Sequence, residues 1–421
     1  MTARPRLLFV SPRFLFPMNE GGKIRTANIL RHLKGGAFEI RLASPAPADY
    51  GIFAREIDAV CDSFVSWPAP TASKLRRLMA LAGAVPVGVA TDRSSAGAAV
   101  IADALAHWRP DVVVADFPHA TVLLPDRVAA TTVNFTHNVE AEIFERHARQ
   151  ARGIWRVVWR DQVRKMRRFE RDALRRYDAV IAVSGRDAEV LGRRYGLMRV
   201  EAIDTGVDLD FFHLMPPPAR DRADTVVFSG VMDSPANMDG IVFLMQDIWP
   251  LVQRARPDAR ALIVGRNPPQ SLIAAARQRG LPWTFTGSVA DIRPYVAEGD
   301  VSVIPLRIGS GTRIKAFEAK AMGRPVVATR VGIEGLDVEP GRHFLVADEP
   351  ADFADGILRL LDDATLRQAL VAAARARLEQ RFSWTIVARQ FEAICWHAWH
   401  RGVASGSETT MLPGIKQAAT A

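Results

Sequence analysis

One segment of the chain combines residue types that bind an anion with a carboxylate placed one and a half turns into a helix. It runs from residue 309 to residue 329 and reads GSGTRIKAFEAKAMGRPVVAT. Its glycines let backbone N–H groups approach an anion, and the N-terminus of the helix adds partial positive charge. The Glu318 carboxylate could accept hydrogen bonds from sugar hydroxyls. The segment predicts a nucleotide-sugar site whose donor-binding residues are Gly309, Ser310, Gly311, Thr312, Arg313 and Lys315.

Other candidate residues follow predicted strands. Gly21 and Gly22 lie between a strand and a helix, where they either admit a phosphate or form an ordinary turn. Gly230 follows another strand and would let the backbone approach a diphosphate. His137 ends the strand 132–136. A histidine there would face the ligand-binding edge of a parallel sheet and could donate to a sugar hydroxyl or a leaving phosphate, although a packed or capping histidine is the alternative.

Strand-like and helix-like segments alternate along both halves of the chain, which predicts an α/β fold of βαβ units with parallel sheets. In the first half we expect strands at residues 7–11, 38–43, 111–115, 132–136, 177–183 and 200–203. In the second half we expect them at 226–228, 261–264, 284–286, 301–304, 325–328 and 344–346. Two doubly wound domains would place their strand ends at one cleft.

A run of three prolines at 216–218, followed by charged residues, predicts a stiff, exposed connection. We therefore predict an N-terminal domain over 1–215, a linker over 216–224, a second domain over 225–380, a terminal helix over 381–400 and a disordered tail over 401–421.

Composition narrows the class of protein. The chain has 421 residues, enough for two domains, and 48% of them are hydrophobic. No run of 18 residues lacks charge, so we expect no transmembrane helix, and the first apolar run is too short for a signal peptide. Only Cys61 and Cys395 occur, which favours a reducing compartment, and we predict a cytoplasmic protein.

The net charge of +9 suits anionic partners such as nucleotides or phospholipid head groups. Residues 149–176 contain eleven arginines and lysines interleaved with apolar residues such as Trp155 and Trp159. This basic amphipathic helix could lie on the inner face of an anionic membrane, or pack on its domain with a solvated arginine face. No motif supports nucleic-acid binding, and we expect none.

The segment 309–329 resembles the donor-binding segment of the GT-B glycosyltransferases, in particular the retaining family-4 type. The Gly21-Gly22 loop and the helix after it are similar to the glycine loop of bacterial members. Asp204-Thr205-Gly206-Val207-Asp208 resembles an inter-domain Asn-Gly-Val-Asp signature. The resemblance covers roughly residues 5–400.

The resemblance implies two Rossmann-like domains facing a cleft and a glycosyl transfer from a nucleoside diphosphate sugar to a hydroxyl acceptor, on a polysaccharide or a lipid-linked glycan. It implies that His137 and Glu318 act in catalysis, and that the turns at Arg266 and Val289 receive the nucleotide base. Members of this type build exopolysaccharides and the cell envelope. No strand-end Asp-x-Asp of the kind that holds a metal is found, so we expect no metal and no cofactor.

One position departs from the family pattern, which has two glutamates separated by seven residues. The second matches Glu318, which implies a ribose contact, but Ser310 stands where the first would bind the transferred sugar. Two other functions therefore stay open: a nucleotide-sugar epimerase or hydrolase on the same fold, and a catalytically inactive nucleotide-sugar-binding subunit.

Overall fold

The computed structural model describes residues 4–69, 73–219, 221–308, 314–334, 336 and 339–404. The chain forms two compact units. The first comprises residues 1–204 with 384–421, and the second residues 205–383. This division differs from the predicted one. Residues 205–215, predicted in the first domain, and the proline segment, predicted as a linker, both lie within the second unit, and the terminal helix belongs to the first.

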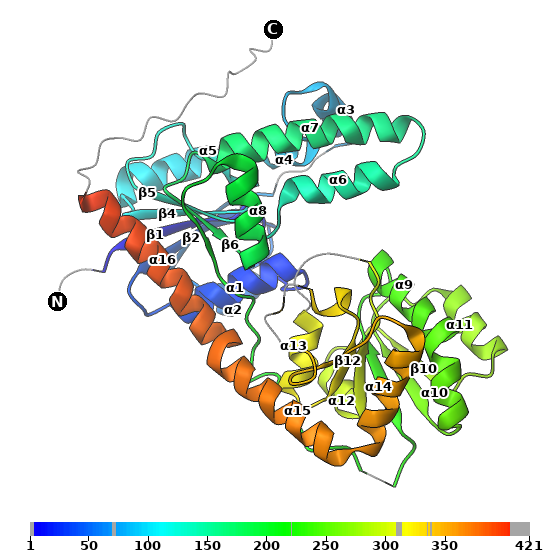
Figure 1. Cartoon of the computed structure of the whole chain (residues 1–421). Helices are drawn as coiled ribbons and strands as arrows, with labels where there is room; N and C mark the ends of the chain where they lie inside the picture. Colours follow the sequence, from blue (N-terminus) through cyan, green and yellow to red (C-terminus); the bar gives the residue numbers. More distant parts are fainter. Residues whose placement is uncertain are drawn as a thin grey trace. The chain divides into compact units, whose positions relative to one another are not determined.

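A seven-stranded sheet forms the centre of the first unit, in the order β3-β2-β1-β4-β5-β6-β7 (Figure 1). Its strands are β1 Arg6–Val10, β2 Glu39–Ala46, β3 Ser63–Pro68, β4 Val112–Asp116, β5 Thr131–Phe135, β6 Ala179–Ala182 and β7 Val200–Ala202. Neighbouring strands pair in parallel, so their carboxyl ends meet at one edge.

Helices cover both faces of this sheet. They are α1 Gly21–Leu33, α2 Ala54–Asp58, α3 Lys74–Ala82, α4 Val87–Asp92, α5 Ser95–Asp103, α6 Glu140–Gln150, α7 Ile154–Leu174, α8 Gly185–Tyr195 and α16 Trp384–Ala404, with short turns at Tyr50–Phe53, Ala104–Trp108 and Pro118–Leu123. Along β1, Leu7 and Phe9 enter one core and Leu8 and Val10 the other. The strands are apolar runs because both faces are buried.

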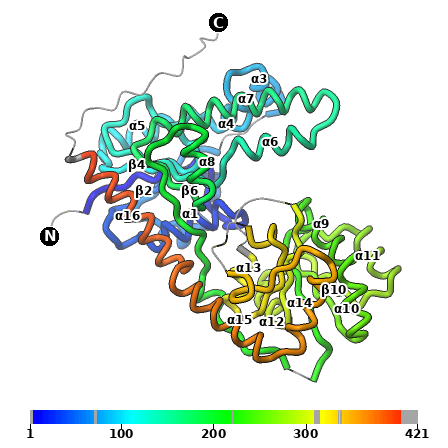
Figure 2. Tube along the Cα trace, viewed as in Figure 1, coloured from blue at the N-terminus to red at the C-terminus, as the bar shows by residue number. Residues whose placement is uncertain are grey.

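The terminal helix α16 completes the core of the first unit. Figure 2 shows it, in red, beside the blue α1. Phe391 of α16 packs against Phe9 of β1 and Phe135 of β5, with ring centroids 6.4 and 5.2 Å apart. The helix begins at Trp384 rather than at the predicted residue 381, and residues 401–404 continue it, whereas the rest of the predicted tail lies outside the described residues.

The second unit contains a six-stranded parallel sheet in the order β10-β9-β8-β11-β12-β13. Its strands are β8 Thr225–Ser229, β9 Arg260–Val264, β10 Trp283–Gly287, β11 Val301–Ile304, β12 Val326–Ala328 and β13 Leu345–Val346. Its helices are α9 Pro235–Phe243, α10 Trp249–Ala255, α11 Gln270–Gln278, α12 Arg293–Ala297, α13 Ile314–Ala321, α14 Pro350–Asp362 and α15 Ala364–Arg377, with shorter turns at Leu244–Ile248, Val331–Ile333 and Leu378–Phe382. The prediction of two doubly wound α/β domains is confirmed.

Candidate functional site

His137 lies two residues beyond β5, at the carboxyl edge of the first sheet. Its side chain is buried, and Nε2 lies 2.7 Å from Asp116 Oδ1. Arg25 Nη1 lies 3.2 Å from Nδ1. Because a guanidinium can only donate, Nδ1 accepts and Nε2 carries the proton that is donated to Asp116. Burial lowers the pKa of His137, which favours the neutral ring that a hydrogen bond from Arg25 to Nδ1 requires.

The Asp116 carboxylate also accepts hydrogen bonds from two hydroxyl groups. Ser11 Oγ donates to Oδ2 at 2.9 Å, and Thr26 Oγ1 donates to Oδ1 at 3.1 Å. Asp116 ends β4 and Ser11 follows β1, so the parallel sheet brings them together. His137 therefore occupies the predicted edge, but both of its ring nitrogens contact protein, and its contact with a donor stays a prediction.

Gly22 is needed for packing around this histidine. The Phe117 ring stacks on His137 with centroids 4.0 Å apart, and a Cβ on Gly22 would lie 2.8 Å from Phe117 Cζ. Phe117 has a φ of 65°, a left-handed conformation that is strained for a residue with a side chain. Gly21, at the start of α1, has no atom within 4 Å of such a Cβ. The two adjacent glycines thus differ: Gly22 admits an aromatic ring and Gly21 faces open space.

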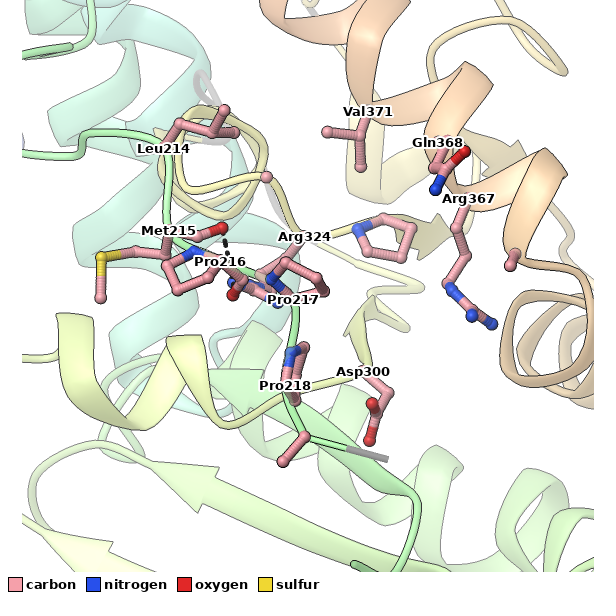
Figure 3. A pocket seen from close by; sticks show the side chains of 14 residues that line it. Leu214, Met215, Pro216, Pro217, Pro218, Asp300, Arg324, Arg367, Gln368 and Val371 are labelled. Carbon is pink, nitrogen blue, oxygen red and sulfur yellow. Dashed lines mark hydrogen bonds between the residues drawn. The ribbon is translucent and has the colours of Figure 1, made fainter. Parts of the chain in front are cut away.

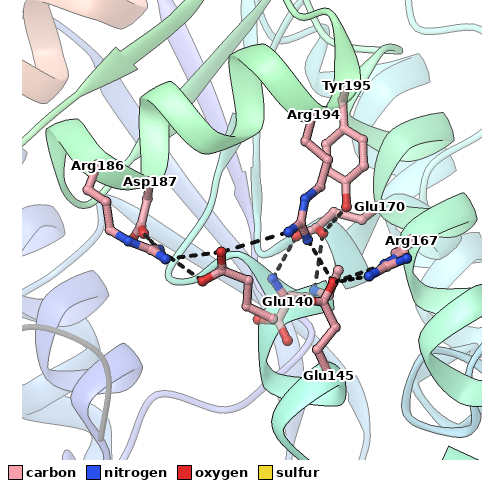
Figure 4. Close-up of polar contacts among 10 residues, drawn as sticks. Glu140, Glu145, Arg167, Glu170, Arg186, Asp187, Arg194 and Tyr195 are labelled. Atoms are coloured by element: carbon pink, nitrogen blue, oxygen red, sulfur yellow. Dashed lines mark hydrogen bonds and ion pairs between the residues drawn. The ribbon is translucent and has the colours of Figure 1, made fainter. Parts of the chain in front are cut away.

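A buried carboxylate holds the helix that starts three residues after His137. Glu170 of α7 accepts the N–H groups of Glu140 and Ala141 at 2.7 and 3.2 Å, which caps α6. Tyr195 of α8 donates its hydroxyl to the same carboxylate at 2.6 Å. Burial raises the pKa of Glu170 to about 7. Figure 4 shows this cap together with the ion pairs that Glu145 makes with Arg167 and Arg194.

In the second unit, glycine turns follow three adjacent strands. Gly230 comes after β8, Gly265 after β9, and Gly287 ends β10. Gly265 has a φ of 156°, and a Cβ on it would overlap the carbonyl oxygen of Gly230. The Gly230 N–H donates to Val264 O at 2.9 Å. At the carboxyl edge of the second sheet, the backbones of these glycine turns therefore lie close together with no side chain between them.

Lys315 lies beside the Gly230 turn. Its Nζ donates to Asn237 Oδ1 at 2.9 Å and lies 4.5 Å from the centroid of the Phe228 ring. Asn237 Nδ2 in turn donates to Val231 O at 2.8 Å. A Cβ on Gly230 would lie 2.8 Å from Asn237 Nδ2, so glycine is required for this packing. The predicted donor residues Gly230 and Lys315 are brought together.

Glu318 lies one turn after Lys315 on α13 and is half-buried. Burial raises the pKa of its carboxyl group to about 7, and the nearby Lys315 ammonium opposes that rise. Among the described residues, no hydrogen bond to its side-chain carboxylate is found. Because its oxygens have no such partner, the Glu318 carboxylate can accept hydrogen bonds from a ligand's hydroxyl groups.

The remaining predicted donor residues fall into two groups. Arg266 is exposed after β9, and Val289 is half-buried in the apolar cluster beneath β9 and β12. Gly309, Ser310, Gly311, Thr312 and Arg313 lie outside the described residues.

The described part of the chain contains no group of three or more His, Cys, Asp or Glu side chains that could hold a metal ion. An Asp-x-Asp occurs at Asp208-Leu209-Asp210, after β7. There Asp208 Oδ1 accepts hydrogen bonds from the N–H groups of Asp210 and Phe211 at 3.2 and 2.9 Å, so this carboxylate closes a turn.

No helix within the described ranges is long and apolar enough to cross a membrane.

Solved structures share this fold. A glycosyltransferase from Rickettsia africae superposes with a TM-score of 0.64, covering 94% of this chain and 98% of that one at 16% identity. Anabaena HepE in complex with UDP-glucose superposes with a TM-score of 0.62, covering 96% and 100% at 16% identity. At such identities the likeness concerns the fold, which is GT-B.

Family models match both units. The model described as Glycosyltransferase Family 4 matches residues 20–211, and the one described as Glycosyl transferases group 1 matches residues 223–363. The chain is a family-4-like GT-B glycosyltransferase.

A curated relative of this glycosyltransferase is the phosphatidyl-myo-inositol mannosyltransferase of Mycobacterium tuberculosis, which is 32% identical over 204 residues. The match covers 46% of this chain, and the chain spans about half the length of the curated relatives it matches.

Sequence reasoning missed several residues of the glycosyltransferase around His137. Asp116, Thr26 and Ser11 were not singled out, although Asp116 and Ser11 stand at the ends of predicted strands. That position was the available signal, because the carboxyl ends of parallel strands meet at one edge. In the second unit Asn237 was not predicted either, and nothing in the sequence near it indicates its contact with Lys315.

Proposed function

We propose that the protein transfers a glycosyl group from a nucleoside diphosphate sugar to a hydroxyl acceptor on a lipid-linked glycan or a polysaccharide, with retention of configuration. The observation that carries this proposal is the group formed by Gly230, Lys315 and Glu318. An ammonium beside the Gly230 turn and a carboxylate without a hydrogen-bond partner among the described residues complement a diphosphate next to a ribose. Anabaena HepE, with the same fold, is known in complex with UDP-glucose.

In the proposed reaction the enzyme mainly stabilises the leaving diphosphate. The Lys315 ammonium lies beside the Gly230 turn. A fixed cation at this position would stabilise the negative charge that develops on the leaving diphosphate. We propose that this cation does the work for which other enzymes use a divalent metal. Retention would proceed by departure and attack on the same face of the sugar, without a protein nucleophile.

We propose that His137 is the residue of the first unit that acts in the transfer reaction. Its neutral ring and the Arg25 guanidinium form one buried hydrogen-bonded pair. A small movement of the Arg25 side chain would therefore free Nδ1 of His137 for a hydrogen bond with a bound sugar. Replacing His137 with Ala is expected to lower turnover while the fold is kept.

We propose that the acceptor is reached at an anionic membrane, on its cytoplasmic face. Helix α3 has no buried residue, and its Leu75, Leu78 and Met79 side chains are 65%, 64% and 62% exposed. Such exposed apolar residues on one short basic helix are typical of a membrane or protein contact.

Helix α3 contacts the basic helix α7, since Lys165 Nζ donates to Leu81 O at 2.6 Å. At the start of α7, Ile154, Trp155 and Val157 are also exposed. Trp159, one turn farther along the same face of the helix, stacks on His147 of α6 and is covered by it, whereas Trp155 is exposed. Farther along α7 a cationic groove is lined by Arg160, Arg164, Arg167, Arg168 and Arg171, with Arg194 of α8. Exposed apolar side chains near many cations suit anionic lipid.

Product analysis tests the transfer. The purified protein would be incubated with radiolabelled UDP- and GDP-sugars and with vesicles that contain phosphatidylinositol or a polyprenyl-linked glycan, both of which present hydroxyl groups. We expect label in the lipid fraction with one donor, in EDTA as well as in Mg²⁺, and an anomeric configuration equal to that of the donor. Free sugar alone would indicate a hydrolase, a changed sugar nucleotide an epimerase, and no turnover with any donor a binding subunit.

Calorimetry tests the donor site separately. Replacing Glu318 with Ala is expected to weaken binding of UDP or GDP by about 1–3 kcal/mol, the cost of losing charged hydrogen bonds to ribose. Glu349→Ala, which removes an exposed carboxylate of the same unit, is the matched control. Equal affinities in both variants would contradict the assignment of Glu318.

A further inference from the structure

A pocket of the C-terminal unit lies away from the candidate donor site. It has a volume of about 650 Å³ and is shown in Figure 3. Its lining includes Asp300 and Pro325, which directly precede β11 and β12. The pocket therefore lies at the amino ends of the parallel strands, whereas Gly230 follows the carboxyl end of β8. Ligand sites of such sheets usually lie at the carboxyl ends, so this pocket is distinct from the donor site.

The walls of the pocket are mostly aliphatic and fixed in place. One wall is the segment 214–219, and the other is α15 with Val371. The segment is held against the turn before β12, because Met215 N donates to Met322 O at 3.3 Å. A Cβ on Gly323 would lie 2.6 Å from Leu214 Cδ1, so the two surfaces are in close contact. Three successive prolines add stiffness, and a preformed apolar wall results.

Arg324 brings a buried positive charge to this pocket. Only 2% of the residue is exposed, and its Nη2 donates to the carbonyl oxygens of Met215 and Pro216. Its Nε is buried without a hydrogen-bond partner. No carboxylate among the described residues forms an ion pair with it. The Asp300 carboxylate partly compensates this charge without a direct ion pair. A buried cation without a direct ion pair is costly, and an anion in the pocket would offset that cost.

Arg367 adds a second cation from α15. Its Nη1 donates to the carbonyl oxygens of Leu360 and Leu361 at 2.6 and 2.8 Å, and it makes no ion pair within the described ranges. The one carboxylate in the lining, Asp300, is already engaged, since it accepts the Thr225 N–H at 2.8 Å and lies 3.1 Å from Arg222 Nη2. The pocket thus has an excess of positive charge.

We propose that this pocket binds a small amphiphilic carboxylate, whose aliphatic body packs against the proline segment and Val371 and whose anionic head is held by Arg324 and Arg367. The volume is within the range of small-molecule pockets. The proposal does not depend on the transferase activity, because it uses none of the donor-site residues.

Calorimetry on the full chain tests it with decanoate, decanol and inorganic phosphate. We expect decanoate to bind with one-to-one stoichiometry and roughly tenfold or more tighter than decanol, because only the carboxylate makes charged hydrogen bonds. Binding of decanol with equal affinity would overturn the role of the arginines. Phosphate binding as tightly as decanoate would show a simple anion site, and absence of decanoate binding would overturn the proposal altogether.

Three variants locate the binding. Val371→Trp should fill the pocket and abolish decanoate binding, and Arg367→Gln should weaken it about tenfold. Arg359→Gln, an exposed arginine of α14 outside the lining, is the control and should bind as the wild type does. Thermal unfolding of each variant checks that the unit is folded. Undiminished binding by a folded Val371→Trp variant would place the ligand elsewhere, for example on α3 and α7, and would overturn the assignment.

Discussion

The His137 imidazole and the Asp116 carboxylate form a buried pair in which Nε2 lies 2.7 Å from Oδ1. With Arg25 on the other ring nitrogen, this pair keeps the ring neutral and in one tautomer. A change at Asp116 therefore alters the state of His137 without removing its side chain.

Replacing Asp116 with Asn is expected to lower the free energy of unfolding by about 1–3 kcal/mol, because charged hydrogen bonds become neutral ones and the buried Arg25 loses a nearby negative charge. Urea unfolding measures the loss, and nitrogen NMR of His137 reports the tautomer. Ser11→Ala, which removes a single hydrogen bond to the same carboxylate, should cost less. Equal losses in the two variants would show that the charge of Asp116 contributes nothing.

Two adjacent glycines allow a sharp comparison. Gly22→Ala should destabilise the first unit by about 1–3 kcal/mol, because the added methyl group would lie 2.8 Å from Phe117 Cζ and force the ring off His137. Gly21→Ala, with nothing within 4 Å, should be neutral or stabilise α1 by up to about 1 kcal/mol. Thermal unfolding of both variants is the measurement. Similar melting temperatures would contradict the packing role of Gly22.

The raised pKa of Glu318 predicts a pH dependence of stability. Since folding raises this pKa from 4.5 to about 7, the folded state binds the proton more tightly than the unfolded state. The stabilisation is complete below pH 4.5 and is lost as the pH rises through 7. Relative to Glu318→Gln, the wild type should lose up to about 3 kcal/mol between pH 4.5 and 8. Urea unfolding at several pH values checks this, and parallel curves for the two proteins would refute it.

Vesicle sedimentation tests the membrane proposal. Replacing Leu75 and Leu78 with Ser should reduce binding to anionic vesicles about tenfold or more, because two exposed apolar side chains no longer enter the lipid. Met198→Ser is the control, since Met198 is 94% exposed on the same unit but lies outside α3 and α7. Binding of the wild type should fall steeply with added salt. Equal recovery with neutral and anionic vesicles would leave only the alternative of a solvated arginine face.

The sequence predicted inner strands well because they are apolar on both faces. Val112–Ala115 could be assigned from its residues alone. The edge strand Ser63–Pro68 was not predicted, since serines at 63 and 66 interrupt its apolar residues, it is mostly half-buried and it ends in proline. The contacts of His137 could not be predicted in full, because Arg25 comes from a helix that periodicity describes only as amphipathic. Likewise, nothing in the sequence near Arg324 indicates that its guanidinium holds Met215, more than a hundred residues away.

The position of α16 in the first unit bears on how the chain folds during synthesis. Phe391 and its neighbours fill the core formed around β1 and β5, yet the ribosome adds them about 180 residues after the last strand of that sheet. At roughly 5–20 residues per second, the first core would remain incomplete for about 10–40 s while the second unit is made. The second unit, which is continuous in sequence, can fold in that interval. The N-terminal half of the protein is therefore expected to be the last to reach its native state.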